Sequence, residues 1–187
     1  KGNGVVWLLR KGADVTAPWT ATEIDKSQSV HRIRWIDANG DGRKLIVNAP
    51  LAAAAAVPPD YKGTLSVYAY DPADGKRQTI TDAEEGVVHG ITVVDWDGKG
   101  REALLTASFL GVHLHRYANG TWTRTRLVEG NKAPWPNSGA GDVAAVRTKT
   151  GRMLAVIEPF HGTSQPYPNL DLALYTGKGD TFGNRTV

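Results

Sequence analysis

Two histidines stand at equivalent positions of an internal repeat. The segments His31-Arg-Ile-Arg-Trp-Ile-Asp and His89-Gly-Ile-Thr-Val-Val-Asp share histidine, isoleucine and aspartate in register, and a Gly-Arg pair follows each of them. An imidazole titrates near pH 6.5, so paired histidines supply both a base and an acid around neutrality. Histidine clusters also hold divalent ions such as zinc or magnesium. The repeat is equally compatible with histidines that serve only the packing of the fold.

The elements that carry these histidines read as short strands. Residues 64–70 (TLSVYAY) alternate with period two, and residues 43–50 form a β-branched run after an Asp/Gly turn. Alternation over short runs between turn signals predicts strands rather than helices. The expected strands are 31–37, 43–50, 64–70 and 77–82, then 89–95, 102–108, 111–117 and 121–128, then 142–147, 152–158 and 170–175.

Four strands per repeat, with no helical stretch, predict an all-β fold built of propeller blades. We expect the end of one blade in 1–30, one blade each in 31–87 and 88–130, and an incomplete blade in 139–187. About three and a half blades would be present, as part of a seven-bladed ring that the rest of a longer chain or a second chain completes. A ring left open would expose sheet edges, which favour aggregation.

Composition excludes several classes of protein. The 187 residues are 41% hydrophobic and 22% charged, a globular balance with a net charge of +3. The basic residues are scattered, so no nucleic-acid partner is expected. The longest apolar run, residues 51–57, is too short to span a bilayer and reads as a loop. The absence of cysteine rules out disulfides and thiolate metal sites but leaves the compartment open; we expect a secreted protein, extracellular or periplasmic.

Blade topology gathers the candidate site residues at one mouth of the channel. The loop before each first strand and the loop between the second and third strands emerge on the same face. An aromatic-rimmed polar hollow of this kind suits a sugar. Glu158 is equally compatible with a role as a loop cap, and His113 and His115 are interpreted as surface or packing residues. The residues expected at the mouth are His31, His89, His161, Asn48, Phe109, Glu158 and Phe160, with Tyr61 and Tyr167 at the rim.

The turn from Asp37 to Gly42 resembles the opening of a calcium loop, with Asp37, Asn39 and Asp41 as possible ligands. It lacks the glutamate of the twelfth position, where Asn48 stands. The second copy has Lys99 in place of an acid. A tight Asp/Gly turn is the alternative explanation, and a calcium ion here would be structural because the turn lies on the face opposite the histidines.

Several short segments follow one another in a recognisable order: Val6-Trp-Leu8, Trp19-Thr20, His31-Arg32, Val88-His89, Gly139-Ala-Gly141 and Phe160-His-Gly162. In these segments the chain resembles the propeller domain of fungal aldos-2-ulose dehydratases. More broadly, its Asp/Gly turns are similar to those of FG-GAP or VCBS propeller repeats, and its architecture is similar to that of the rhamnose–glucuronate lyases. The cupin domains of the dehydratase are not part of this sequence, and the third repeat departs from the pattern because Gly141-Asp142 stands in place of a histidine.

The resemblance implies a carbon–oxygen lyase that acts by β-elimination on a sugar or a uronate-containing glycan. His31 or His89 would be the base, and His161 or a rim tyrosine the acid. Arg32 or Arg34 would pair with a substrate carboxylate, and a metal or a cation would stabilise the enolate-like intermediate. Two other functions remain open: a non-catalytic propeller that binds glycans or protein partners, and a purely structural repeat that binds calcium.

Overall fold

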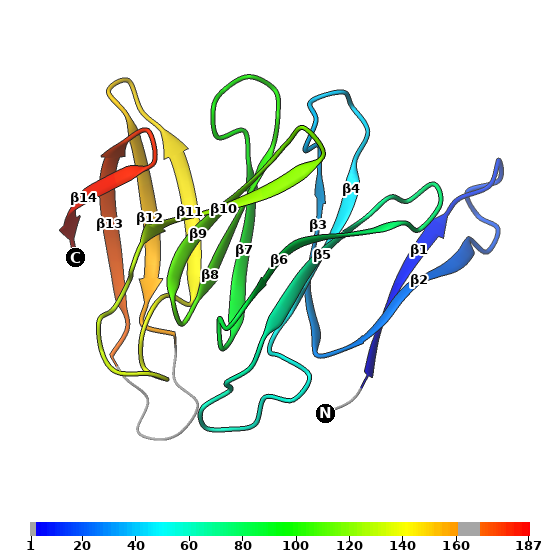
Figure 1. Ribbon diagram of the computed structural model, residues 1–187. Coiled ribbons are helices and arrows are strands. Elements are labelled where there is room, and N and C mark those ends of the chain that lie inside the picture. Colours follow the sequence, from blue (N-terminus) through cyan, green and yellow to red (C-terminus); the bar gives the residue numbers. More distant parts are fainter. Residues whose placement is uncertain (1–2, 161–168) are drawn as a thin grey trace.

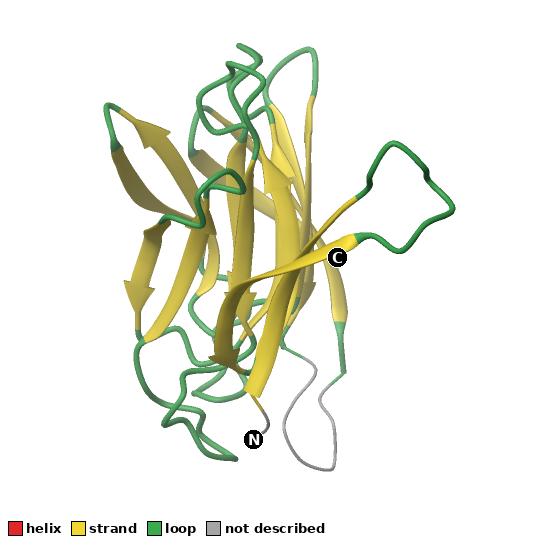
Figure 2. Cartoon of the chain, turned by 90° about the vertical axis from the view of Figure 1, so that its right-hand side faces the viewer, coloured by secondary structure: helices red, strands yellow, loops and turns green. Residues whose placement is uncertain are grey.

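The computed structural model describes residues 3–160 and 169–187, and in this part of the chain all regular structure is β-strand (Figures 1 and 2). The first sheet pairs β1 (Asn3–Arg10) with β2 (Thr20–Gln28). The second sheet contains β3 (Val30–Ile36), β4 (Leu45–Pro50), β5 (Leu65–Tyr70) and β6 (Arg77–Ala83). The third contains β7 (Val88–Val94), β8 (Ala103–Ser108), β9 (Gly111–Ala118) and β10 (Thr121–Val128). The fourth contains β11 (Asp142–Arg147), β12 (Arg152–Glu158), β13 (Asp171–Lys178) and β14 (Thr181–Thr186).

Every sheet is an antiparallel meander in sequence order, which is the construction of a propeller blade. The first strands of successive four-stranded sheets are neighbours, with β3 against β7 and β7 against β11. The fourth strands are neighbours on the outside, with β6 against β10 and β10 against β14. Figure 1 shows the sheets side by side in this order. The predicted all-β propeller architecture is confirmed. The described residues include no helix that could cross a membrane.

Burial explains the different sequence patterns of the strands. All six residues of β8 (ALLTAS) are buried, because sheets cover both faces of its blade, and the strand therefore reads as a nearly continuous apolar run. On β13 burial alternates: Ala173 and Tyr175 pack against the third sheet, whereas Leu172 and Leu174 are exposed. One face of this last sheet is thus covered and the other is open.

A polar network joins the third and fourth sheets at the end opposite the histidines. Asp180, in the turn between β13 and β14, accepts hydrogen bonds from Trp96 Nε1 at 2.9 Å and from Arg116 at 2.6 and 2.7 Å. Arg152 lies over the Trp96 ring, 4.8 Å from its centroid, and donates to the Trp96 carbonyl. These contacts fix the relative position of β9, β12 and the turn between β7 and β8.

Candidate functional site

Two β-bulges determine where His31 and His89 lie. In the second sheet Val30 pairs with Pro50 and Arg32 with Ala49, which leaves His31 as an additional residue of β3. In the third sheet Val88 pairs with Ser108 and Gly90 with Ala107, which leaves His89 as an additional residue of β7. A bulge bends its strand and redirects the side chain of the extra residue. The two imidazole rings consequently meet, with centroids 5.2 Å apart and planes inclined by 43°.

Hydrogen bonds hold His89 in place between the neighbouring first strands. Its Nδ1 lies 3.1 Å from the carbonyl oxygen of Gly141, and because a carbonyl only accepts, Nδ1 carries the proton in this contact. Arg32 Nε donates to the carbonyl oxygen of His89 at 2.7 Å. Gly90, beside the histidine, has no room for a side chain, since a Cβ there would lie 2.7 Å from the Cα of Asp142. The strands β3, β7 and β11 are therefore connected at the level of the histidines.

His31 is exposed, and its surroundings favour the neutral imidazole. Desolvation lowers the pKa of His31 first, and the charges of Arg32 and of His89 lower it further. A neutral, solvent-accessible imidazole at neutral pH is able to accept a proton. His31 makes no hydrogen bond or ion pair with the described residues. His89 is thus held in a fixed orientation, and His31 lies beside it as an accessible histidine that is able to accept a proton.

A row of aromatic rings extends from the histidines towards the outer loops. Phe160 contacts His89 at 5.4 Å between centroids, Phe109 contacts Phe160 at 5.1 Å, and Trp135 contacts Phe109 edge-on at 4.9 Å. Trp135, from the loop between β10 and β11, donates its indole N–H to the carbonyl of Asp60. Aromatic contacts of this geometry stabilise beyond simple burial. The rings therefore form a rigid support behind His89.

Four residues that we predicted as ligand contacts are buried instead. Phe109 and Phe160 belong to the aromatic row, and Asn48 and Glu158 have no exposure to solvent. Asn48 Nδ2 donates to Ser27 Oγ at 3.4 Å. Glu158 accepts from Tyr175 at 2.8 Å and from Arg185 at 3.2 Å, so it ties β12 to β13 and β14. We therefore revise the prediction that these four side chains face a ligand, because the packing of the loops turns them inward.

The other predicted residues differ in accessibility. Arg34 is exposed and its only hydrogen bond within the described ranges goes to the carbonyl of Ile33, so its guanidinium remains available to a ligand. Arg32 is partly buried and is engaged with His89. Tyr61 packs against the core between the second and third sheets. His161 and Tyr167 lie outside the described residues.

The predicted calcium loop is a hydrogen-bonded turn. Both carboxylate oxygens of Asp37 accept backbone N–H groups, from Gly40 at 2.8 Å, from Asp41 at 3.2 Å and from Gly42 at 2.8 Å. Asp41 accepts from the N–H of Arg43. Asp95 accepts from Lys99 and Gly100 in the same way. The structure therefore has the tight Asp/Gly turn that was the alternative explanation, and a calcium ion at Asp37, Asn39 and Asp41 stays a prediction.

Within 3–160 and 169–187 no group of three or more His, Asp or Glu side chains is arranged to hold a metal ion. His31 and His89 are two nitrogen donors, whereas a catalytic zinc needs three protein ligands. A zinc or magnesium ion at the histidines would need a further ligand from outside these ranges.

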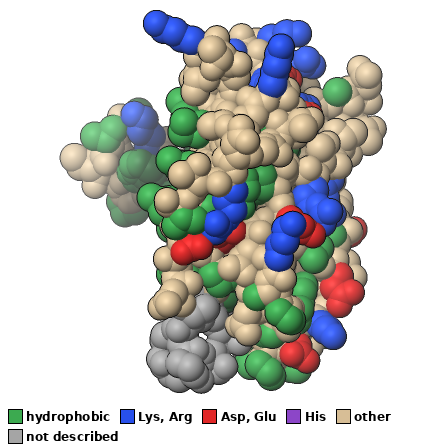
Figure 3. Space-filling model, turned by 90° about the vertical axis from the view of Figure 1, so that its left-hand side faces the viewer, with side chains coloured by type: hydrophobic (Ala, Val, Ile, Leu, Met, Phe, Trp, Pro, Cys, Tyr) green, Lys and Arg blue, Asp and Glu red, His purple; other side chains and the backbone are tan. Residues whose placement is uncertain are grey.

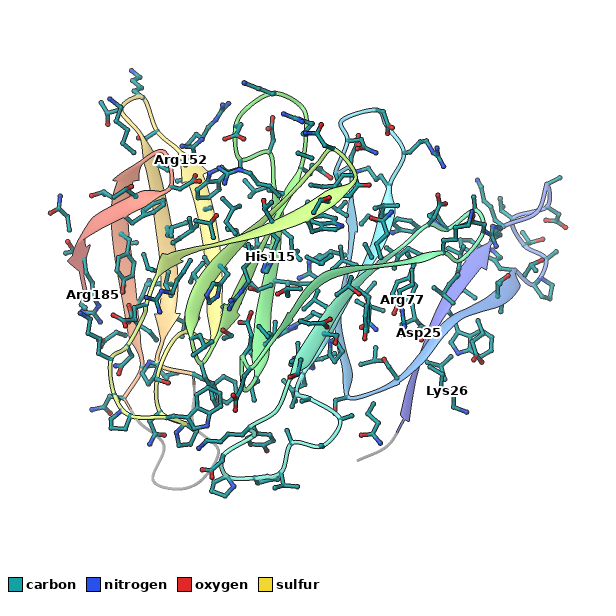
Figure 4. All side chains as sticks on the ribbon, in the orientation of Figure 1. Asp25, Lys26, Arg77, His115, Arg152 and Arg185 are labelled. Atoms are coloured by element: carbon teal, nitrogen blue, oxygen red, sulfur yellow. The ribbon has the colours of Figure 1, made fainter. Side chains whose placement is uncertain are left out.

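A buried polar cluster behind the aromatic row did not stand out in the sequence. Glu85, from the loop between β6 and β7, has no exposure and pairs with Arg124 at 2.8 Å. His113 and His115 are buried packing residues, and His115 (labelled in Figure 4) bonds through Nε2 to Thr106 at 3.0 Å. Burial lowers the pKa of both imidazoles to about 3. The alternation His-Leu-His next to the apolar run of β8 was the only signal of this burial in the sequence.

In a comparison with protein families, the model of the β-propeller domain of aldos-2-ulose dehydratase matches residues 2–166. This range includes β1 to β12 and both bulge histidines. A search of curated proteins finds no similar protein. Since the match spans most of the sequence, the chain belongs to the family of aldos-2-ulose dehydratase β-propeller domains.

Proposed function

We propose that this protein is a carbon–oxygen lyase that dehydrates a sugar, or cleaves a uronate-containing glycan, by β-elimination at the histidine-lined mouth of the propeller. The observation that carries the proposal is the pair of bulge histidines, whose rings lie 5.2 Å apart on adjacent first strands. Membership of a sugar dehydratase family supports a role with carbohydrates. Two substrate classes are proposed. Keto-sugars follow from the membership of the dehydratase family, and uronates follow from the architectural resemblance to the rhamnose–glucuronate lyases.

His31 is the proposed base. Its imidazole is accessible but partly desolvated, and this desolvation and the charge of Arg32 lower its pKa, so it is neutral at pH 7. It takes the proton from the carbon beside the carbonyl or carboxyl group of the sugar. The C–H electron pair forms the new carbon–carbon double bond, the bond to the leaving oxygen breaks, and an acid supplies a proton to that oxygen. We propose His161 or a rim tyrosine as the acid.

The remaining residues bind the substrate or orient the two histidines. The guanidinium of Arg34 is exposed and suits a substrate carboxylate or the negative charge that develops on the carbonyl oxygen. Arg32 holds the backbone of His89 and keeps the pKa of His31 low. The aromatic row fixes the ring of His89, which provides a rigid wall beside the base. In the alternative in which both imidazoles bind a divalent ion, His31 would be a ligand rather than the base, and the ion would supply charge to stabilise the enolate-like oxygen.

A propeller that binds glycans without catalysis is the second candidate. It is favoured by the burial of Asn48, Phe109, Glu158 and Phe160, because among the predicted catalytic and ligand-binding residues that the structure describes only His31 and Arg34 are then exposed to a ligand. In this case His31 would be a hydrogen-bonding contact, and its replacement would weaken binding in a protein that forms no product.

The test follows the ultraviolet absorbance of the new conjugated double bond. The protein is incubated with keto-sugars such as glucosone and 1,5-anhydrofructose, and separately with uronate-bearing glycans. We expect a signal with one substrate class that disappears in His31→Asn, and that persists in the control Lys149→Gln at the exposed turn between β11 and β12. Circular dichroism shows whether each variant is folded. Glycan binding without any absorbance change would support the binding module and overturn the lyase.

A further inference from the structure

The position that follows His31 in β3 and His89 in β7 carries a different residue in each of the three four-stranded sheets. Arg32 of β3, Gly90 of β7 and Asp142 of β11 are equivalent, because each lies opposite the last residue but one of the second strand of its sheet. Since β7 contacts both β3 and β11, these three positions lie side by side at the level of His89. Successive first strands therefore offer a cation, an open position and an anion.

The carboxylate of Asp142 lies at the edge of β11 that is not paired with β12. Its Oδ1 accepts a hydrogen bond from the N–H of Val143 at 2.9 Å, and the carbonyl of Val143 accepts one from the hydroxyl of Thr92 on β7 at 2.7 Å. In an antiparallel strand the N–H and the C=O of one residue point to the same side, so the carboxylate lies on the side of β7. Oδ1 would be 2.3 Å from a Cβ at Gly90, so the glycine leaves the space in which the carboxylate lies beside His89.

Asp142 differs from the other acids of the last sheet because it has no cation beside it. Figure 3 shows the molecule from the side of this sheet, where acidic and basic side chains lie next to one another. Asp171 pairs with Arg185 at 2.7 Å, and Asp180 pairs with Arg116 at 2.6 Å. Asp142 is exposed, and the backbone N–H described above is its only partner for a hydrogen bond or ion pair within 3–160 and 169–187. The second carboxylate oxygen, Oδ2, is thus available to a ligand.

We propose that Asp142 is a substrate-binding residue that accepts a hydrogen bond from a hydroxyl group of the sugar at the histidine site. The inference rests on the proposed function, since it takes the ligand of that site to be a sugar. A carboxylate accepts hydroxyl hydrogens in charge-assisted hydrogen bonds, which are stronger than those between neutral groups. The same charge repels a carboxylate, so an end of the sugar that bears a hydroxyl faces β11.

Opposite charges on the two outer strands of the site orient the sugar. Arg34 of β3 and Asp142 of β11 are both exposed, and β7 with His89 lies between their strands. The carbonyl or carboxyl end of the sugar is attracted to Arg34 and lies beside His31, whereas a hydroxyl remote from that end lies against Asp142. This orientation presents the acidic C–H bond to the proposed base.

The test uses a ligand that binds without reacting. The probe is 1,5-anhydroglucitol, a neutral polyol without a carbonyl group, together with its monodeoxy derivatives, each of which lacks one hydroxyl. Calorimetry measures the binding of each compound. Asp142→Asn removes the charge but keeps the size of the side chain and an oxygen for the Val143 N–H, so the fold should be unchanged. Glu23→Gln is the matched control, because it removes a carboxylate from an exposed position of β2, in the first sheet.

We expect Asp142→Asn to weaken the binding of the polyol about tenfold, and Glu23→Gln to leave it unchanged. One monodeoxy derivative should bind the wild type and Asp142→Asn equally, because it lacks the hydroxyl that the carboxylate binds. The same difference with every derivative would indicate a structural effect and overturn the proposal. A polyol affinity that Asp142→Asn does not change would also overturn it, as would the absence of polyol binding to the wild type.

Turnover distinguishes this proposal from the proposed function. With a reacting keto-sugar, Asp142→Asn should raise KM about tenfold and leave kcat nearly unchanged, since the hydroxyl contact is the same before and during the reaction. Polyol binding that depends on Asp142, without product from any substrate, would refute the lyase and keep the carboxylate contact. Product formation with an unchanged KM in Asp142→Asn would keep the lyase and refute the contact.

Discussion

Arg124 on β10 lies 2.8 Å from the carboxylate of Glu85, a side chain with no exposure to solvent. The other carboxylate oxygen is 3.7 Å from Nδ1 of His113. Arg124 neutralises the Glu85 carboxylate. Glu85 therefore does not stabilise the protonated form of His113. Burial and the charge of Arg124 instead lower the pKa of His113 to about 3. Burial, reinforced by the charge of Arg124, thus keeps His113 neutral.

The first prediction concerns stability in acid. His113 and His115 have a pKa of about 3 in the folded protein, against about 6.5 in the unfolded chain. The unfolded chain therefore binds more protons between these two pH values, and stability falls as pH decreases through this window. Each histidine contributes at most about 1.4 kcal/mol per pH unit. Urea unfolding at pH 7.5, 6 and 5 should show this loss, and the double variant His113→Gln/His115→Gln should show a smaller slope. An unchanged slope would contradict the buried, neutral state.

The second prediction concerns the ion pair itself. Arg124→Met leaves the Glu85 carboxylate buried without its cation, and we expect a loss of about 3 kcal/mol in the free energy of unfolding. The double variant Glu85→Gln/Arg124→Met removes the stranded charge and should recover part of that loss. Denaturant titrations of both variants measure the difference. Equal stability of the single and the double variant would show that the pair is energetically unimportant.

The third prediction concerns the pH dependence of the proposed reaction. Activity requires neutral His31, so it falls as pH drops below the pKa of His31, which burial and then Arg32 hold below 6.5. Arg32→Gln removes one of these causes and should move the acid limb of kcat/KM to higher pH, whereas Arg32→Lys should leave it in place. An NMR titration of the His31 ring checks the same shift without turnover. A limb that does not move in Arg32→Gln would mean that another group is the base.

The fourth prediction tests the close approach of β7 and β11. A Cβ at Gly90 would lie 2.3 Å from Asp142 Oδ1 and 2.7 Å from Asp142 Cα. Gly90→Ala should therefore cost about 2 kcal/mol of stability and separate His89 from the Gly141 carbonyl. Gly12→Ala is the control, since no atom lies within 4 Å of a Cβ there. Thermal unfolding measures both, and equal melting temperatures would show that the strands have room to separate.

The sequence was sufficient for the architecture but only partly for the site. Alternation in β5 and the apolar run of β8 depend on local burial, and both were readable from residue types. The bulges at His31 and His89 could not be predicted from residue types. An additional residue in a strand can be recognised only when the partner strand and its register are known. The burial of Asn48 and Glu158 depends on how separate loops and strands pack, which no single segment specifies. The turn at Asp37 was predicted as one of two alternatives, and the backbone N–H groups around its carboxylate favour the turn.

The bulges also bear on how blades of this kind diverge. The ladder of β11 with β12 runs without a register shift and carries no histidine at its start, yet its sheet is otherwise the counterpart of the two before it. One additional residue in the first strand thus distinguishes the two sheets that present an imidazole at this level from the third, which presents the Gly141 carbonyl. An imidazole at this level therefore depends on one residue per blade, while the ladders of the strands that carry the fold are otherwise alike.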